Sequence, residues 1–272
     1  MIVRIVEEFD LSAMSSDEPL RSRYDGAAQA VCVSALDLKS GLHVSPKIAR
    51  NIDRFTSMAI KIADDARDSL ERMAAPDRIG VFVGNVFGGW NYAEEDLRAL
   101  HDSGPATVRA HLATAWFPAA AQGEITIKHQ WTGAAKTFSG RESCLAEALL
   151  AAAMAVELRR IDAALVLWSE SLLSDFLLWG VGLRSADRLS ADVAYGLVLA
   201  SGSHAAKAGT LVKIERETGP HPGYNPLLVD SDPCAVLRAS SDSIQALLSG
   251  RSEASHLSLN NGNGIVLRRM DS

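Results

Sequence analysis

Short apolar segments alternate with longer helix-like segments through most of this 272-residue chain, and this alternation limits the folds available to it. Residues 79–84, 161–168 and 194–201 have the length and the apolar, β-branched content of buried strands. Residues 45–73 repeat apolar side chains at helical spacing, among them Ile52, Phe55 and Ile62. Because buried strands need helices over both faces, the pattern predicts an α/β layered fold.

The rest of the chain gives weaker signals. Residues 15–23 are polar and predict a loop, and residues 219–255, rich in Pro, Gly and Ser, predict a looser tail. Residues 92–101 predict a helix, and another helix begins at Trp116. The remaining predicted strands are residues 1–6, 28–36, 124–128, 210–217, and a pair formed by 256–259 and 264–269.

Composition excludes several functional classes. The net charge of -6, with no Lys/Arg cluster to offset it, argues against a nucleic-acid partner. Cys32, Cys144 and Cys234 are widely spaced and form no Cys-x-x-Cys pair, which fits a reducing compartment. Charges come too early in the chain for a signal peptide, and apolar runs such as residues 149–156 are too short to cross a bilayer. We therefore expect a cytoplasmic protein with no membrane span.

The sequence predicts no cofactor and no metal. The glycine-containing loop at residues 84–89 lacks the Gly-Lys-Ser/Thr ending of a phosphate loop and the spacing of a dinucleotide site. His221 has no Cys or Asp at the spacing of metal ligands. A turn that ends a strand accounts for the first segment, and a loop accounts for the second.

Residues 133–149 predict a buried strand, a tight turn at Gly140 and a helix rich in Ala and Leu. A strand, a turn and a helix in this order can present a nucleophile at a helix N-terminus, where backbone N–H groups and the helix dipole favour a developing anion. Glu142 occupies the position of the nucleophile in this pattern.

Several segments resemble, in order and spacing, the N-terminal half of the thiolase-like β-ketoacyl synthases. They are Asp53-Arg54-Phe55 within residues 52–63, the glycine-ended segment 78–84 with Gly88-Gly89, residues 117–127, Gly133, the segment from 142 to 170, and residues 196–209. The resemblance covers roughly residues 45–217. It implies a thiolase-like layered α-β-α fold for residues 1–217, with residues 218–272 a reduced C-terminal remnant packed on the same core.

Three departures from the family pattern carry functional meaning. The family's nucleophilic cysteine is replaced by Glu142. Its two catalytic histidines lie in a His-Gly-Thr-Gly-Thr motif and a Gly-His motif, and neither motif occurs here. Its C-terminal glycine turn is reduced to residues 261–264, so the second half is shortened. The chain is thus similar to the chain-length factors, the nucleophile-free subunits of type II polyketide and aryl-polyene systems, which commonly carry glutamine at this position.

That resemblance implies a non-catalytic subunit that pairs with an active ketosynthase, shapes its acyl tunnel and meets acyl carrier protein through the complex. Trp116 and Phe117 would line the interface and tunnel, and Lys136, Thr137 and Phe138 would lie on the strand that pairs across the dimer. Glu142 would cap the helix that follows it.

Two alternatives remain open. Cys144 could be the nucleophile of a stand-alone acyltransferase or thioesterase, or else a small core residue in the helix. The chain could also be a homodimeric scaffold that binds an acidic carrier protein. The candidate cations for that docking are Arg50, Arg54, Lys61, Arg67 and Arg72. They could equally serve only as the solvent-exposed face of a helix.

Overall fold

The computed structural model describes residues 1–11, 15–21, 30–36, 45–140, 143–177, 188–190, 192–201, 209–217, 233–258 and 264–270. The helices are α1 (Pro46–Ala49), α2 (Arg54–Met73), α3 (Trp90–Ser103), α4 (Leu112–Trp116), α5 (Ala120–His129), α6 (Cys144–Glu157) and α7 (Pro233–Leu248). The strands are β1 (Ile2–Asp10), β2 (Ser15–Arg21), β3 (Ala30–Leu36), β4 (Ile79–Asn85), β5 (Ala135–Ser139), β6 (Ala163–Ser171), β7 (Arg188–Ser190), β8 (Asp192–Ser201), β9 (Thr210–Glu217), β10 (Ala254–Ser258) and β11 (Gly264–Arg269).

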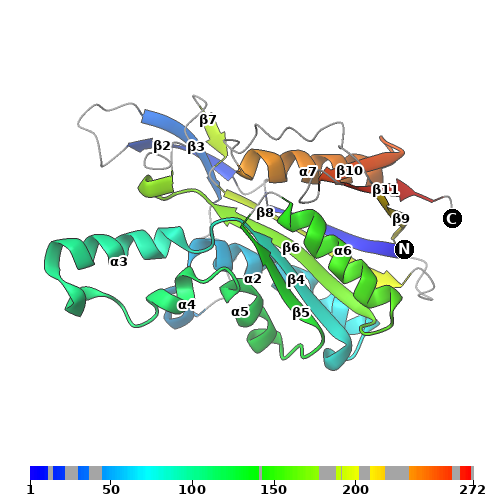
Figure 1. The fold of residues 1–272 in the computed structure, drawn as a ribbon, viewed down its shortest axis with the longest axis horizontal. Coiled ribbons are helices and arrows are strands. Elements are labelled where there is room, and N and C mark those ends of the chain that lie inside the picture. The colour runs from blue at the N-terminus through cyan, green and yellow to red at the C-terminus, as the bar shows by residue number, and fades with distance from the viewer. Residues whose placement is uncertain are drawn as a thin grey trace.

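One mixed sheet organises the chain (Figure 1). Its strand order is β10-β11-β9-β1-β8-β6-β4-β5, and β2, β3 and β7 form a separate three-stranded sheet. The pairs β4–β5 and β4–β6 are parallel, whereas β6, β8, β1, β9, β11 and β10 pair antiparallel in succession. The expected pairing of the last two strands is therefore confirmed.

Helices cover both faces of this sheet, which confirms the α/β layered class. On one face Leu145 and Leu149 of α6, with Ile244 and Leu247 of α7, pack into one buried cluster. On the other face α2 and α5 contribute to a second cluster that includes Phe55. Burying each large aliphatic side chain contributes about 1.5–3 kcal/mol, so both interfaces stabilise the layering. α3 extends away from the sheet (Figure 1).

The Asp53 carboxylate caps two helices at once. Its Oδ1 accepts the Phe55 N–H at 3.0 Å, in the first turn of α2. Its Oδ2 accepts the Tyr92 N–H at 2.7 Å, in the first turn of α3. A side chain that accepts N–H groups at a helix start satisfies donors that the helix leaves unpaired. One buried acid thus fixes where both helices begin, and the predicted single helix over residues 45–73 is divided into α1 and α2.

Several sequence predictions are wrong, among them the helix expected to begin at Trp116, where α4 instead ends. The polar residues 15–23 were expected to form a loop, yet residues 15–21 form β2 at the edge of the small sheet, where polar residues and proline are tolerated. Residues 124–128 are helical in α5, because Ala121 and Ile125 bury at helical spacing against α2 and override the β-branched residues there. Residues 219–255 include the helix α7, whose apolar face covers the sheet.

Among the described residues, no helix combines the length and the apolar character required to cross a bilayer.

Replacing Asp53 with alanine should lower the free energy of unfolding by about 2 kcal/mol at pH 7.5, because two helix starts lose an acceptor. Urea denaturation followed by circular dichroism measures this loss. Asp68→Ala, an exposed position within α2, is the matched control and should stay within about 0.5 kcal/mol of the parent. Equal losses in both variants would contradict the double-cap assignment.

Candidate functional site

The strand–turn–helix predicted around Gly140 is present as β5, a turn and α6. Gly140 has φ +106°, and its N–H donates to the Asn85 carbonyl oxygen at 3.3 Å, which fixes the turn against the end of β4. Glu142, the residue at the nucleophile position, lies outside the described residues, which resume at Ser143. α6 begins at Cys144, so the order of strand, glycine turn and helix is as predicted.

Cys144, the rival nucleophile, is the first residue of α6 and is only 1% exposed. It packs beneath Gly84 of β4, where an added Cβ would approach the Cys144 sulfur to 3.3 Å. A nucleophilic thiol must reach a thioester in solvent or in a pocket. The buried position therefore favours Cys144 as a core residue.

Strand β5 is an outer strand of the main sheet, so the predicted burial of this strand is wrong. Among the described strands β5 pairs with β4 alone, and Lys136 is exposed while Thr137 and Phe138 are half-buried. The Lys136 ammonium lies 4.8 Å from the centre of the Phe138 ring. The Thr137 Oγ1 atom is buried with no hydrogen-bond partner in the described structure. One backbone edge of β5 is thus available for pairing.

Trp116 and Phe117 form a corner between α4 and α5, and the two side chains are 45% and 58% exposed. Trp116 packs edge-to-face against Trp90 of α3, with ring centres 6.1 Å apart. Trp90 in turn stacks on Phe176 at 4.7 Å. Exposed aromatic groups gathered in this way are typical of surfaces that bind another protein.

The loop of residues 85–89, between β4 and α3, lies directly against the corner. The Gly89 N–H donates to the Trp116 carbonyl oxygen at 3.1 Å. A Cβ at Gly89 would lie 2.1 Å from the Ala115 carbonyl oxygen, and one at Gly88, where φ is +70°, would lie 2.7 Å from that of Trp116. Only glycine permits this approach of two backbone segments.

Asn85 joins the same loop to β5. Its side chain donates through Nδ2 to the Pro118 carbonyl oxygen at 2.7 Å, and its Oδ1 accepts from the Ser139 hydroxyl at 3.1 Å. The residue is fully buried. A buried amide with both its donor and its acceptor used fixes its neighbours strongly.

Two buried acids lie beneath the loop. The Glu170 Oε2 atom accepts the Val86 and Phe87 N–H groups at 2.5 and 3.2 Å. Burial raises the pKa of Glu170 to about 8 despite those two hydrogen bonds, and the nearby Asp53 charge adds to the rise. Burial also raises the pKa of Asp53 to about 6. At neutral pH Asp53 is therefore mainly ionised, and Glu170 mainly carries a proton.

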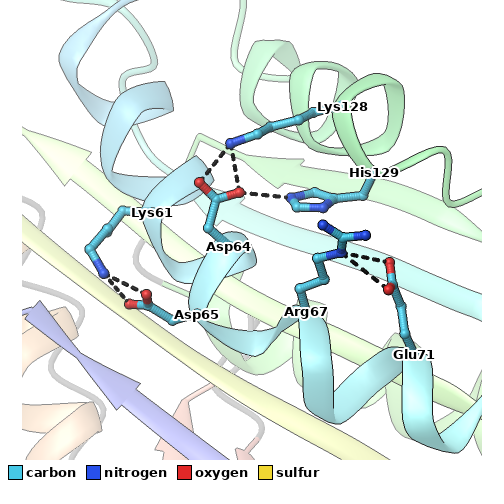
Figure 2. A network of polar contacts seen from close by, with 7 residues as sticks. All are labelled: Lys61, Asp64, Asp65, Arg67, Glu71, Lys128 and His129. Carbon is cyan, nitrogen blue, oxygen red and sulfur yellow. Dashed lines mark hydrogen bonds and ion pairs between the residues drawn. The ribbon is translucent and has the colours of Figure 1, made fainter. Parts of the chain in front are cut away.

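The cations considered for carrier-protein docking are largely neutralised within the chain. Arg54 pairs with Asp192 at 2.6 Å, Lys61 with Asp65 at 2.5 Å, and Arg67 with Glu71 at 3.1 Å. Figure 2 shows the last two pairs along α2, and Asp64 held by Lys128 and His129 of α5. The Arg72 guanidinium donates to the Ser69 hydroxyl, and that of Arg50 to the Pro46 carbonyl oxygen. Because positive and negative side chains alternate along α2, little net positive potential remains on its exposed face.

The structure brings the Gly140 turn, β5 and the aromatic corner together around the 85–89 loop. Sequence reasoning missed Asn85 and the structural role of Glu170, each a polar residue at or near the end of an apolar strand. The sequence signal that could have identified both residues is a polar side chain within an apolar run. No group of three or more His, Cys, Asp or Glu side chains in the described part of the chain could hold a metal ion.

Comparison with known proteins identifies the family. The β-ketoacyl synthase N-terminal domain matches residues 14–202. The chain belongs to the β-ketoacyl synthase family. A 3-oxoacyl-[acyl-carrier-protein] synthase 2 of Staphylococcus aureus is 36% identical over 89 residues, which are 31% of this chain and 22% of that protein. The matched segments span only about a quarter of the length of the curated relatives.

Solved structures confirm the thiolase-like ketosynthase fold. A type II polyketide synthase acyl-carrier protein in complex with its ketosynthase bound to a hexaketide contains a chain that matches with TM-score 0.71 and 18% identity, covering 100% of this chain and 99% of that one. The ishigamide ketosynthase/chain length factor matches with TM-score 0.63 and 18% identity, covering 90% and 73%. The first match includes α7 and the β10–β11 hairpin, so the whole described arrangement has a solved counterpart.

Glu170 should make the protein less stable as pH rises. Its folded pKa of about 8 exceeds the ordinary value of 4.5, so stability present below pH 4.5 is lost progressively up to pH 8. Between pH 6 and 8.5 the parent should lose about 2–3 kcal/mol more than Glu170→Gln, which has no proton to release. Urea denaturation across this range measures the difference, and parallel pH profiles would contradict it.

Cys144 should resist alkylation in the folded protein. Iodoacetamide should modify it at least about 100-fold more slowly under native conditions than in urea, because the reagent reaches the thiol only through local opening. Mass spectrometry of the peptide that contains Cys144 measures both rates. Rapid native labelling, or acylation by an acyl thioester, would instead support the stand-alone acyltransferase.

Proposed function

We propose that this chain is a non-catalytic subunit, similar to a chain-length factor, that pairs with an active β-ketoacyl synthase in polyketide or fatty-acyl chain elongation. It supplies part of the wall of the acyl tunnel and stabilises its partner. The partner contributes the nucleophilic cysteine and both histidines, decarboxylates a malonyl-type extender and carries out the Claisen condensation.

The observation that carries this proposal is the missing nucleophile. Strand β5 is followed after Gly140 by α6, the order of elements in the family's nucleophile pattern, yet the sequence places the carboxylate of Glu142 where the family has a thiol. The nearest thiol, that of Cys144, is 1% exposed. A carboxylate at this helix N-terminus caps the helix and complements its dipole without forming a thioester.

The exposed surface supports a partner of the same fold. Within the described part of the chain β5 has one unpaired backbone edge, on the strand that carries Lys136, Thr137 and Phe138, and the Trp116–Phe117 corner lies across the 85–89 loop from it. A strand edge supplies backbone hydrogen bonds for pairing, and exposed aromatic groups supply apolar area. Together they form a continuous interface for a second ketosynthase-like chain.

The named relatives support the partnership. Solved neighbours include ketosynthases in complex with chain length factors and with an acyl-carrier protein. Since Arg54, Lys61 and Arg67 are already paired with acids, the α2 face is a poor docking surface for an acidic carrier. The carrier protein therefore reaches the condensation site through the ketosynthase. Residues 218–272 serve in this proposal as a reduced second half that extends the same sheet.

Co-expression with a ketosynthase encoded beside this chain tests the proposal. Size-exclusion chromatography with mass determination should show a 1:1 or 2:2 complex, and the chain should be poorly soluble without its partner. Condensation activity should stay within about twofold in Glu142→Ala and fall at least about 1,000-fold when the partner's nucleophilic cysteine is removed.

Three outcomes would overturn this assignment. A well-behaved lone chain that ignores the ketosynthase would exclude the heteromeric subunit, and a homodimer would point to a scaffold. Thioester chemistry lost in Cys144→Ala and kept in Glu142→Ala would instead identify the stand-alone acyltransferase or thioesterase.

A further inference from the structure

We propose that Asn85 is a positioning residue that holds the Trp116–Phe117 corner and the β5 edge in one fixed arrangement for partner binding. The inference rests on the proposed function, because it concerns the surface through which the chain would bind a ketosynthase. It assigns a role in assembly to a residue that is itself fully buried and contacts no partner.

The Asn85 amide has one contact on each side. Toward the corner, Nδ2 donates to the Pro118 carbonyl oxygen at 2.7 Å. Toward the edge strand, Oδ1 accepts from the Ser139 hydroxyl at 3.1 Å, and the Asn85 backbone carbonyl accepts the Gly140 N–H at 3.3 Å. The side chain therefore links two segments that are 21 residues apart in sequence, at Pro118 and Ser139.

The corner is held on both sides of Phe117. The Trp116 carbonyl oxygen accepts the Gly89 N–H at 3.1 Å, and the Pro118 carbonyl oxygen accepts from Asn85. Phe117, 58% exposed, is thus the most exposed aromatic side chain of the corner and has an anchored carbonyl before and after it. An exposed group held in this way loses little further freedom when it is bound, which favours tight association.

Only an amide satisfies both contacts. A side chain at position 85, itself fully buried, must donate to the Pro118 carbonyl oxygen and accept from the Ser139 hydroxyl. Aspartate would keep the acceptor, lose the donor to Pro118 and add a third acid near Glu170 and Asp53. Alanine would leave the Pro118 carbonyl without its donor and would free the corner from β5.

The test compares Asn85→Ala with Ser169→Ala. Ser169 is also fully buried and donates one hydrogen bond, to the Phe55 carbonyl oxygen at 2.8 Å, away from the corner and β5. Both variants should lower the thermal midpoint. Only Asn85→Ala should weaken the ketosynthase complex, raising its Kd by about 5- to 10-fold through faster dissociation.

A double-mutant cycle gives the sharper readout. If Asn85 acts by holding Phe117, the effect of Asn85→Ala on Kd should shrink to less than half in a Phe117→Ala background. Additive effects on Kd, or an equal loss of affinity in Ser169→Ala, would overturn the proposal. A wild-type chain that binds no ketosynthase would refute the proposed function instead.

Hydrogen exchange tests whether Asn85 couples the corner to β5, and it does so without a ketosynthase complex. In Asn85→Ala, amide exchange should accelerate together in residues 112–119 and residues 135–140, whereas Ser169→Ala should leave both segments unchanged. Ser139→Ala should affect only the second segment. Exchange that stays slow in residues 112–119 of Asn85→Ala would overturn the role of Asn85 in holding the corner.

Discussion

The backbone of residues 85–89 lies against residues 115–118, and the rest of the candidate site depends on this close packing. Gly88 and Gly89 make it sterically feasible, since a Cβ at Gly89 would lie 2.1 Å from a carbonyl oxygen. Glu170 accepts two N–H groups of the same loop. Asp53 accepts an N–H at the start of α3, the helix that follows the loop. The loop thus determines where the aromatic corner, the Gly140 turn and α3 lie relative to one another.

Two buried carboxyl groups beneath this loop have distinct electrostatic roles. Asp53 accepts hydrogen bonds at two helix starts, which favour its charged form, but burial outweighs them and raises its pKa to about 6. Burial raises the pKa of Glu170 further, to about 8, and keeping its proton avoids a second buried negative charge beside Asp53. The loop is therefore held by one ionised and one mainly neutral acid at pH 7, and an arrangement with two charges would repel itself.

The sequence was sufficient for most of the layered core because each signal there was local. Strands β4, β6 and β8 are short apolar runs, and α2 and α6 follow helical spacing or an Ala/Leu-rich run. Sequence-based prediction failed where packing between residues far apart in the chain decides the local structure. Ile125 looked like part of a strand until its burial against α2 was known, and β5 looked buried although it lies at the sheet edge. The links made by Asn85 join residues that no local pattern relates.

An exposed parallel edge strand is a liability for a chain that acts alone. Native proteins protect such edges with charges, bulges or covering elements. On β5 the described structure offers one cation, Lys136, which lies over Phe138, and no covering helix on the outer edge. Beside it, the Trp116 and Phe117 side chains are 45% and 58% exposed. Hydrogen bonds from Asn85 and from Gly89 also tie the edge and the corner to the same loop. In the proposed function these features serve pairing, and none of them depends on the residue at position 142.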